Sequence, residues 1–196
     1  MKILVIDSCI RANSKTRIVL NAFLDTIDKN SNTIEKIVLN NNSKLVSLND
    51  TLLEKRNNDC LNKTFNDSYY DFAKSVKNCD CIIVAAPFYD LTFPSVMKIF
   101  IEQTLISNLT FVDTPQGVKG IVNCKKMIYI AVRGMECNDT NNIDIGSQYL
   151  RGYCNMLGIP VLEKISYSGI TFSELEQKIK DDQNKYKEIF TISSAR

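Results

Sequence analysis

The sequence contains no histidine among its 196 residues. Without imidazole, a Ser-His-Asp triad, a Cys-His pair and a histidine metal ligand are all excluded. Histidine is also the usual acid or base near neutral pH, so any proton transfer must use another residue or a cofactor. The sequence therefore predicts no metal site and no histidine-based catalysis.

Cysteine is present, but without the spacing of a zinc or redox motif. The seven cysteines include no C-x-x-C pair, so zinc ribbons and thioredoxin-type sites are unsupported. A signal-peptide pattern is also missing, because Met1-Lys2 leads directly into an apolar strand. No apolar run approaches the roughly 18 residues of a membrane span. We expect reduced thiols, a cytoplasmic protein and no membrane association.

An excess of either charge is likewise missing. Twenty-four Lys and Arg balance 22 Asp and Glu, which leaves a formal net charge of +2. A protein whose main partner is duplex DNA usually has a dominant basic face, so no nucleic-acid partner is expected. The length is close to the roughly 150 residues of a typical domain, and we interpret residues 1–196 as one domain.

Short apolar runs alternate with helical patterns along the chain. Strands are expected at residues 3–6, 33–39, 81–86, 125–132 and 161–167. Helices are expected at residues 16–29, 65–77, 94–105, 145–157 and 173–190, the last with a capping box of Ser173 and Glu176. The long segment 40–63 is expected to hold a short helix at 45–56 that residues 57–59 interrupt. Five buried strands separated by helices predict an α/β fold, a doubly wound parallel sheet with helices on both faces.

The loop after the first strand, residues 8–16, contains no glycine. That excludes both G-x-G-x-x-G and the Walker A loop, which need glycine for close backbone approach to phosphate. What remains is a polar loop entering a helix N-terminus, where free N–H groups suit an anionic phosphate. Ser14 and Thr16 would add hydroxyl groups, and Lys15 or Arg11 a charge. The alternative is simple helix capping by Ser14 or its neighbour Asn13.

Two further loops follow the third and fourth expected strands. Residues 86–94 place aromatic side chains between Pro87 and Pro94, which favours a rigid cradle for a planar ring; the alternative is that Phe88 and Phe93 cap the core. Arg133-Gly134 ends the fourth strand and permits a sharp turn beside a ligand. In the flavodoxin-like strand order 2-1-3-4-5, all three loops flank the switch point at which FMN binds.

These residues resemble the FMN-dependent NADH-azoreductases, also called FMN-dependent NADH:quinone oxidoreductases, over nearly the whole chain. The most specific match is residues 85–98 (AAPFYDLTFPSVMK) to the family pattern AAPMYNFxxPxxLK. Residues 2–9 (KILVIDSC) with 14–16 (SKT) resemble the family's first strand and phosphate loop. Residues 132–135 (VRGM) resemble its SRGG segment.

The resemblance implies a cofactor, a reaction and an assembly. FMN would take electrons from NADH or NADPH and pass them to a quinone, an azo compound or a nitroaromatic in a ping-pong reaction, within a homodimer. The phosphate end of FMN would lie at Cys9, Ser14, Lys15 and Thr16. The ring would lie between Pro87, Phe88, Tyr89, Asp90 and Leu91 on one side and Val132, Arg133, Gly134 and Met135 on the other. Tyr153 falls where the family has a phenylalanine that stacks over substrate.

Three residues depart from the family pattern: Cys9 replaces a serine, Asp90 an asparagine and Met135 a glycine. Asp90 would repel a reduced, anionic flavin and lower its reduction potential. Two alternatives share the fold, an NAD(P)H-dependent FMN reductase and a flavodoxin-type electron-transfer protein, although flavodoxins are usually strongly acidic. A phospho-acceptor receiver domain is a third alternative. Such domains need an acidic cluster after the first strand and an aspartate after the third, and only Asp7 and Asp90 correspond to these positions.

Overall fold

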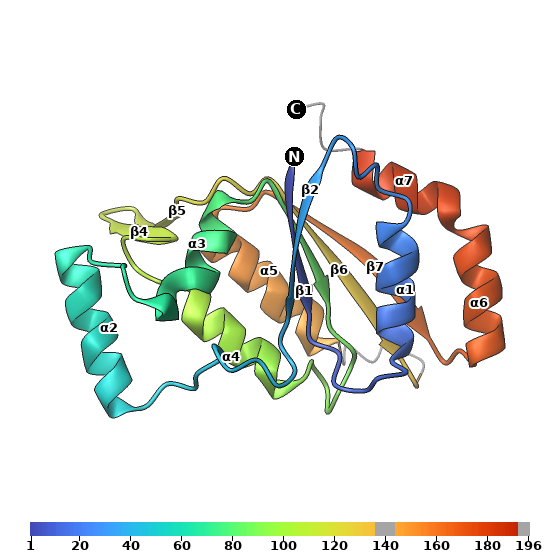
Figure 1. Ribbon diagram of the computed structural model, residues 1–196, viewed down its shortest axis with the longest axis horizontal. Helices are drawn as coiled ribbons and strands as arrows, with labels where there is room; N and C mark the ends of the chain where they lie inside the picture. The colour runs from blue at the N-terminus through green and yellow to red at the C-terminus, as the bar shows by residue number, and fades with distance from the viewer. Residues whose placement is uncertain (136–143, 192–196) are drawn as a thin grey trace.

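Five parallel strands form the centre of the computed structural model, which describes residues 1–135 and 144–191 (Figure 1). They are β1 (Lys2–Asp7), β2 (Thr33–Val38), β3 (Cys81–Ala85), β6 (Lys126–Arg133) and β7 (Val161–Ser168). Their order across the sheet is β2-β1-β3-β6-β7, with every neighbouring pair parallel. Counted along the five strands of this sheet, that is the order 2-1-3-4-5, so the predicted fold class is confirmed.

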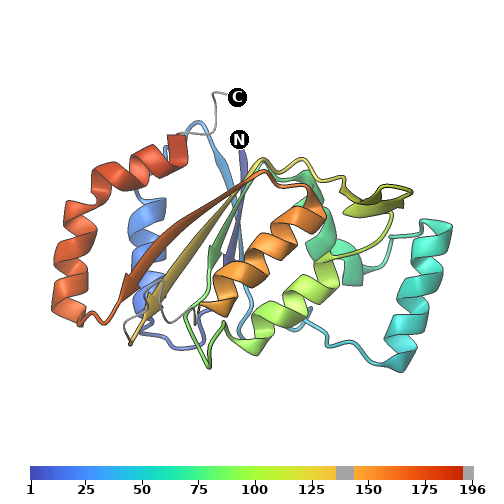
Figure 2. The ribbon, with the colours of Figure 1, turned by 180° about the vertical axis from the view of Figure 1, so that it is seen from behind.

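Helices cover both faces of this sheet (Figures 1 and 2). One face carries α1 (Lys15–Leu24), α6 (Phe172–Asp181) and α7 (Gln183–Thr191). The other carries α3 (Asp71–Asn78), α4 (Ser95–Thr104) and α5 (Ile145–Leu157). Because every strand runs the same way, their carboxyl ends share one edge, at which α1, α4 and α5 begin.

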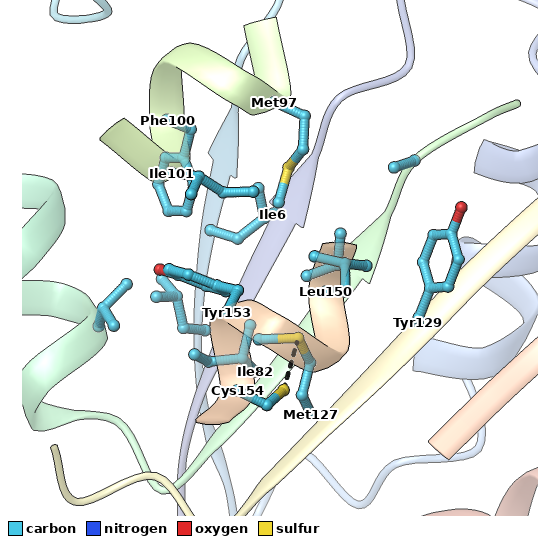
Figure 3. Packing of buried hydrophobic residues seen from close by; sticks show 14 of the residues in the cluster. Ile6, Ile82, Met97, Phe100, Ile101, Met127, Tyr129, Leu150, Tyr153 and Cys154 are labelled. Carbon is cyan, nitrogen blue, oxygen red and sulfur yellow. Dashed lines mark hydrogen bonds between the residues drawn. The ribbon is translucent and has the colours of Figure 1, made fainter. Parts of the chain in front are cut away.

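The central strands are buried on both faces, as their continuous apolar runs predict. Alternate residues of β1 point to opposite sides: Ile3 and Val5 pack toward α1 and α6, whereas Leu4 and Ile6 pack toward α3, α4 and α5. Figure 3 shows part of the core on the side of α3, α4 and α5, in which Met97 and Phe100 of α4 lie over Ile6. Each such side chain contributes roughly 1.5–3 kcal/mol by leaving water.

The segment between β2 and α3 differs from its prediction. Helix α2 covers Asp50–Asn62 and runs through residues 57–59, so the expected helix at 45–56 was wrong at both ends. Asn49 starts the helix by accepting a hydrogen bond from the Leu52 N–H at 2.9 Å. Asp59 does not break the helix because its carboxylate is bound by Lys55 at 2.8 Å and by the Tyr70 hydroxyl at 2.7 Å.

The C-terminal helix predicted at 173–190 is two helices, α6 and α7, divided at Asp182. Asp182 accepts a hydrogen bond from the Tyr167 hydroxyl at 2.7 Å, which ties the division to the end of β7. The capping box was predicted two residues too late. It consists of Thr171 and Glu174, because Thr171 has the extended backbone that a cap requires and Ser173 already lies in the helix.

Three smaller differences concern two helix boundaries and one additional hairpin. The helix predicted at 65–77 is a 3₁₀ turn, η1 (Ser68–Tyr70), followed by α3, and α1 ends at Leu24 rather than at residue 29. A two-stranded antiparallel hairpin, β4 (Phe111–Thr114) with β5 (Gly117–Gly120), was not predicted. Its strands are too short and too polar to give an alternating apolar pattern.

The cysteines in the described part of the chain are all free, and most are buried; Cys137 lies outside the described residues. Within residues 1–135 and 144–191, no helix has both the length and the apolar composition that crossing a lipid bilayer demands.

A close backbone approach at Gly120 generates a stability prediction. A Cβ atom at Gly120 would lie 1.8 Å from the Leu157 carbonyl carbon, at the end of α5. We expect Gly120→Ala to lower the free energy of unfolding by about 3 kcal/mol, since rigid backbone cannot yield to the added methyl group. The measurement is urea denaturation followed by circular dichroism.

Gly152→Ala is the matched control, because Gly152 lies inside α5 with open space around it. It should raise the free energy of unfolding by about 0.5–1 kcal/mol, the helix preference of alanine. Equal effects at the two positions would contradict the proposed role of the Gly120 contact.

Candidate functional site

Three loops meet at the carboxyl edge of the sheet, after β1, β3 and β6. These strands are adjacent, since β3 pairs with β1 on one side and β6 on the other. A contact joins each pair of loops. The Val132 N–H donates to Thr16 Oγ1 at 3.1 Å. The other two contacts are cation–π pairs: Arg11 over the Tyr89 ring at 5.9 Å, and Arg133 over the Phe88 ring at 5.7 Å. The predicted loops therefore surround one site.

A buried ion pair holds the first loop. Arg17 Nε lies 2.8 Å from Asp7 Oδ2, and its guanidinium also donates to the carbonyl oxygens of Cys9 and Arg11. Asp7 additionally accepts the Cys9 N–H at 3.0 Å and lies 3.3 Å from Lys36 Nζ. Burial alone would raise the pKa of the Asp7 carboxyl, but the hydrogen bonds from Arg17 and Cys9 outweigh it and hold that pKa below its ordinary value.

The N-terminus of α1 is equipped for an anion. Ser14 is its N-cap and accepts the Arg17 N–H at a long 3.5 Å, while no described residue accepts the N–H of Lys15 or Thr16. The first turn of the helix carries no acidic residue. Unpaired N–H groups and the positive end of the helix dipole together fit a phosphate group.

Thr16, Lys15 and Arg11 were predicted to help bind a phosphate, and their side chains lie in three different surroundings. Thr16 is 1% exposed, and its hydroxyl oxygen already accepts the Val132 N–H. Lys15 reaches away to α6, where its Nζ donates to the Ile170 carbonyl and lies 4.8 Å from the Phe172 ring. Arg11 is the exposed cation that remains beside the loop.

Cys9 forms part of the floor of this loop. Its side chain is fully buried and its Sγ lies 3.9 Å from the Ala85 carbonyl oxygen. Burial raises the pKa of the Cys9 thiol to about 12, so the thiol stays protonated at neutral pH. The backbone N–H of Cys9 is already donated to Asp7. Cys9 therefore offers a ligand neither a charge nor a free backbone donor.

The second loop is a tight two-residue turn. The N–H groups and carbonyls of Tyr89 and Thr92 form reciprocal hydrogen bonds, both 3.0 Å. Asp90 and Leu91 between them have φ angles of +47° and +74°. Turns of this kind favour Asn-Gly because both central residues need positive φ, so a leucine here is strained. Such strain is common where a loop binds a ligand.

Exposed apolar side chains border the same edge. Ile10, Leu91, Met135 and Ile145 are each more than two-fifths exposed, and each belongs to a segment that adjoins the sheet's carboxyl edge. Gly134, beside Met135, has open space where a Cβ would lie. Single exposed apolar residues are ordinary, but a group of them around loops that meet fits an apolar, planar ligand.

The third loop begins with Arg133, whose side chain is 2% exposed. Its Nη2 lies 2.6 Å from Asp144 Oδ2, and its Nη1 donates to Ser166 Oγ. Asp144 was not among the residues predicted from the sequence. The only local signal is its position as the N-cap of α5, three residues before Ser147, whereas its pairing with Arg133 depends on the tertiary structure.

Tyr153 was predicted to stack over substrate, and the structure corrects this. The side chain is 3% exposed and belongs to the core between α4 and α5 (Figure 3). Its hydroxyl lies 2.7 Å from Thr104 Oγ1. Burial raises the pKa of this phenol. The apolar face of α5 turns Tyr153 inward together with Leu150 and Leu157, so it cannot contact a ligand at the carboxyl edge.

Comparison with known families gives a match over almost the whole chain. Residues 1–190 match the model of a family described as having a flavodoxin-like fold. Among individual relatives, an FMN-dependent NADH:quinone oxidoreductase of Clostridium perfringens is 30% identical over 122 residues. The match covers 61% of this chain and 61% of that protein, so the chain spans less than two thirds of the relative's length.

Solved structures share the fold at low sequence identity. An FMN-dependent NADH-azoreductase from Bacillus anthracis, solved in complex with FMN, superposes with a TM-score of 0.80 at 21% identity, over 96% of this chain and 98% of that one. An azoreductase from the same species gives a TM-score of 0.82 at 16% identity, with the same coverage. At these identities the likeness establishes the fold.

The Asp7–Arg17 pair leads to a prediction with a pH dependence. Arg17→Met should lower the free energy of unfolding at pH 7 by about 2–3 kcal/mol, because it leaves a buried carboxylate with only Lys36 as a cationic partner. Since the folded-state pKa of Asp7 is depressed, the pair stabilises the fold above the unfolded pKa of about 3.9. That contribution is lost as pH falls through the folded pKa. Urea denaturation between pH 3 and 7 measures both effects.

Lys29→Met is the matched control. Lys29 pairs with Asp25 on the surface, with both side chains more than two-thirds exposed, and its loss should change stability by less than about 0.5 kcal/mol. An Arg17 variant that behaves like this control at pH 7 would show that the buried pair does not stabilise the loop.

Proposed function

The chain belongs to the family with a flavodoxin-like fold, and from this we propose that it is an FMN-dependent oxidoreductase that takes electrons from NADH or NADPH. Its acceptors would be quinones, azo compounds or nitroaromatics. The observation that carries the proposal is the meeting of unpaired N–H groups at Lys15 and Thr16 with the apolar border of Leu91 and Met135. One end of the site suits a phosphate and the other a flat apolar ring, which are the two ends of FMN.

The names of the relatives support the same reading. The Clostridium perfringens protein is an FMN-dependent NADH:quinone oxidoreductase, and the structural neighbour that contains FMN is an NADH-azoreductase. FMN, when bound, would supply the two-electron transfer between donor and acceptor, and the protein binds, orients and excludes water. This division of labour suits a chain that has no histidine.

Each loop has a defined part in the proposed site. Ser14, Lys15 and Thr16 would hold the phosphate, with backbone N–H groups as the main donors. Residues 87–91 and 132–135 would enclose the ring between them. Cys9 and Thr16 Oγ1 would support the site from below, because both are buried and already engaged with the chain.

We also propose a cytoplasmic homodimer with neither nucleic acid nor membrane as a partner. The exposed apolar border around the site is a surface that a second copy would cover, and the balanced net charge of +2 argues against duplex DNA. The free thiols among the described residues fit a reducing compartment. Sedimentation of the purified protein with and without FMN tests the dimer.

The function is tested by absorption spectroscopy of the purified protein mixed with FMN. We expect shifted flavin bands that bleach on anaerobic addition of NADH or NADPH and return when a quinone is added, with parallel double-reciprocal plots for donor and acceptor. Bound flavin that neither nucleotide reduces would instead favour an electron-transfer protein. Reduction followed by release of the flavin would favour an FMN reductase, and no binding would refute the proposal.

Asp90 tunes the proposed flavin by charge. Asp90→Asn should raise the two-electron midpoint potential, because it removes a carboxylate that repels the reduced, anionic ring. An interaction of about 1 kcal/mol corresponds to a rise of about 20 mV. Spectroscopic titration against a reference dye measures the potential of the bound flavin.

Asp25→Asn is the control for Asp90. Asp25 is an equally simple charge removal, but it follows the C-terminus of α1, at the end of the helix farthest from the loops. Its potential should match that of the wild type. A lower potential in the Asp90 variant would contradict the repulsion argument.

A further inference from the structure

Asp144 gathers more partners than the N-cap of a helix needs. Its Oδ1 accepts the Ser147 N–H at 3.1 Å, which is the capping bond of α5. Its Oδ2 lies 2.6 Å from Arg133 Nη2 and also accepts from Lys164 Nζ and the Ser147 hydroxyl. Serine, threonine or asparagine would cap this helix as well as aspartate. The negative charge of Asp144 is therefore not needed for capping, and its pairing with the buried Arg133 explains why an aspartate is present.

Arg133 is a buried cation at the end of β6. Its carbonyl oxygen accepts the Gly169 N–H at 3.2 Å, and its guanidinium stands over the Phe88 ring at 5.7 Å. No described residue accepts a hydrogen bond from its Nε or Nη2, so Nη2 is matched by the Asp144 carboxylate as an ion pair only. A buried guanidinium without a carboxylate partner is strongly destabilising, so Asp144 determines whether Arg133 can remain between Phe88 and β7.

The chain of contacts runs from one proposed ring-binding loop to the other. Asp144 fixes Arg133, Arg133 contacts Phe88 in the second loop, and Arg133 itself belongs to the third loop. The guanidinium thus lies between the two segments whose separation sets the width available to a planar ring. The low pKa of Asp144, about 2, keeps the carboxylate charged at any working pH: burial opposes ionisation, but Lys164, Ser147 and Arg133 outweigh it.

We propose that Asp144 is a positioning residue that acts through Arg133 to fix the spacing of residues 87–91 and 132–135, and so the fit of the flavin ring. The inference rests on the proposed function, because it concerns the ring of the FMN that function requires. It assigns no contact between Asp144 and a ligand. Such supporting contacts matter because a displacement of the binding groups by about 1 Å can lower activity about a hundredfold.

Asp144→Asn is the direct test, because asparagine keeps the N-cap and removes only the charge. We expect affinity for FMN and for riboflavin to fall together by about tenfold, since the change acts at the ring and not at the phosphate. The ratio of the two affinities should stay constant. The visible circular dichroism of the bound flavin should also change, a signal that general loss of stability would not alter.

Two further variants separate positioning from folding. Asp182→Asn is the matched control: Asp182 accepts from a buried tyrosine hydroxyl and lies between α6 and α7, on the face of the sheet away from α5. It should lower the melting temperature and leave flavin affinity and dichroism unchanged. Should Asp144→Asn fail to fold, Arg133→Lys is the second test. Lysine keeps the positive charge but lacks the forked guanidinium that reaches both Asp144 and Ser166. It should lower the affinities for FMN and riboflavin by the same factor.

The outcomes distinguish this inference from the function on which it rests. Wild-type protein that binds neither FMN nor riboflavin would overturn both. Wild-type binding with unchanged affinity and dichroism in Asp144→Asn would overturn the positioning role alone. Loss confined to FMN would also overturn it, because the effect would then lie at the phosphate end.

Discussion

The ion pair between Asp7 and Arg17 is the interaction on which the rest of the site depends. It joins the last residue of β1 to the first turn of α1 and holds the carbonyl oxygens of the connecting loop from within. The loop contains no glycine, and the hydrogen bonds from Arg17 to its carbonyl oxygens hold its path into the helix. The N–H groups of Lys15 and Thr16, at the start of α1, find no acceptor among the described residues.

Most cationic side chains near the carboxyl edge of the sheet already bind groups of the protein. Arg17 binds Asp7, Lys15 reaches the carbonyl of Ile170, and Arg133 binds Asp144. Arg11 alone, among the described residues that line the first loop, remains exposed and unpaired by a carboxylate. Recognition of an anion must therefore come mainly from fixed backbone dipoles. Such dipoles have a fixed orientation, which would suit the phosphate of the proposed FMN.

The sequence predicted those parts of the molecule that local patterns encode. Continuous apolar runs identified the central strands β1, β3 and β6, and Gly158 correctly ended α5 through its left-handed backbone at φ +72°. The edge strands β2 and β7 were also located, but the prediction that all five strands are buried was wrong for these two, which carry exposed polar residues. The errors arose where distant residues decide the outcome. Tyr153 looked like a ligand-facing aromatic, but α5 packs it against Thr104; Asp59 looked like a helix breaker, but Tyr70 and Lys55 bind it. Asp144 was missed because its main partner lies eleven residues away and on another element.

The register of the sheet determines the outline of its carboxyl edge. Strand β3 pairs with β6 only as far as Ala85 and Ile130, whereas β6 and β7 continue together to Arg133 and Ser168. The carboxyl edge is therefore stepped by three residues, about 10 Å. This step is built from strand lengths and backbone hydrogen bonds, not from particular side chains. Replacements such as Cys9, Asp90 and Met135 alter the side chains at this edge, whereas its backbone outline follows from the strand pairing alone.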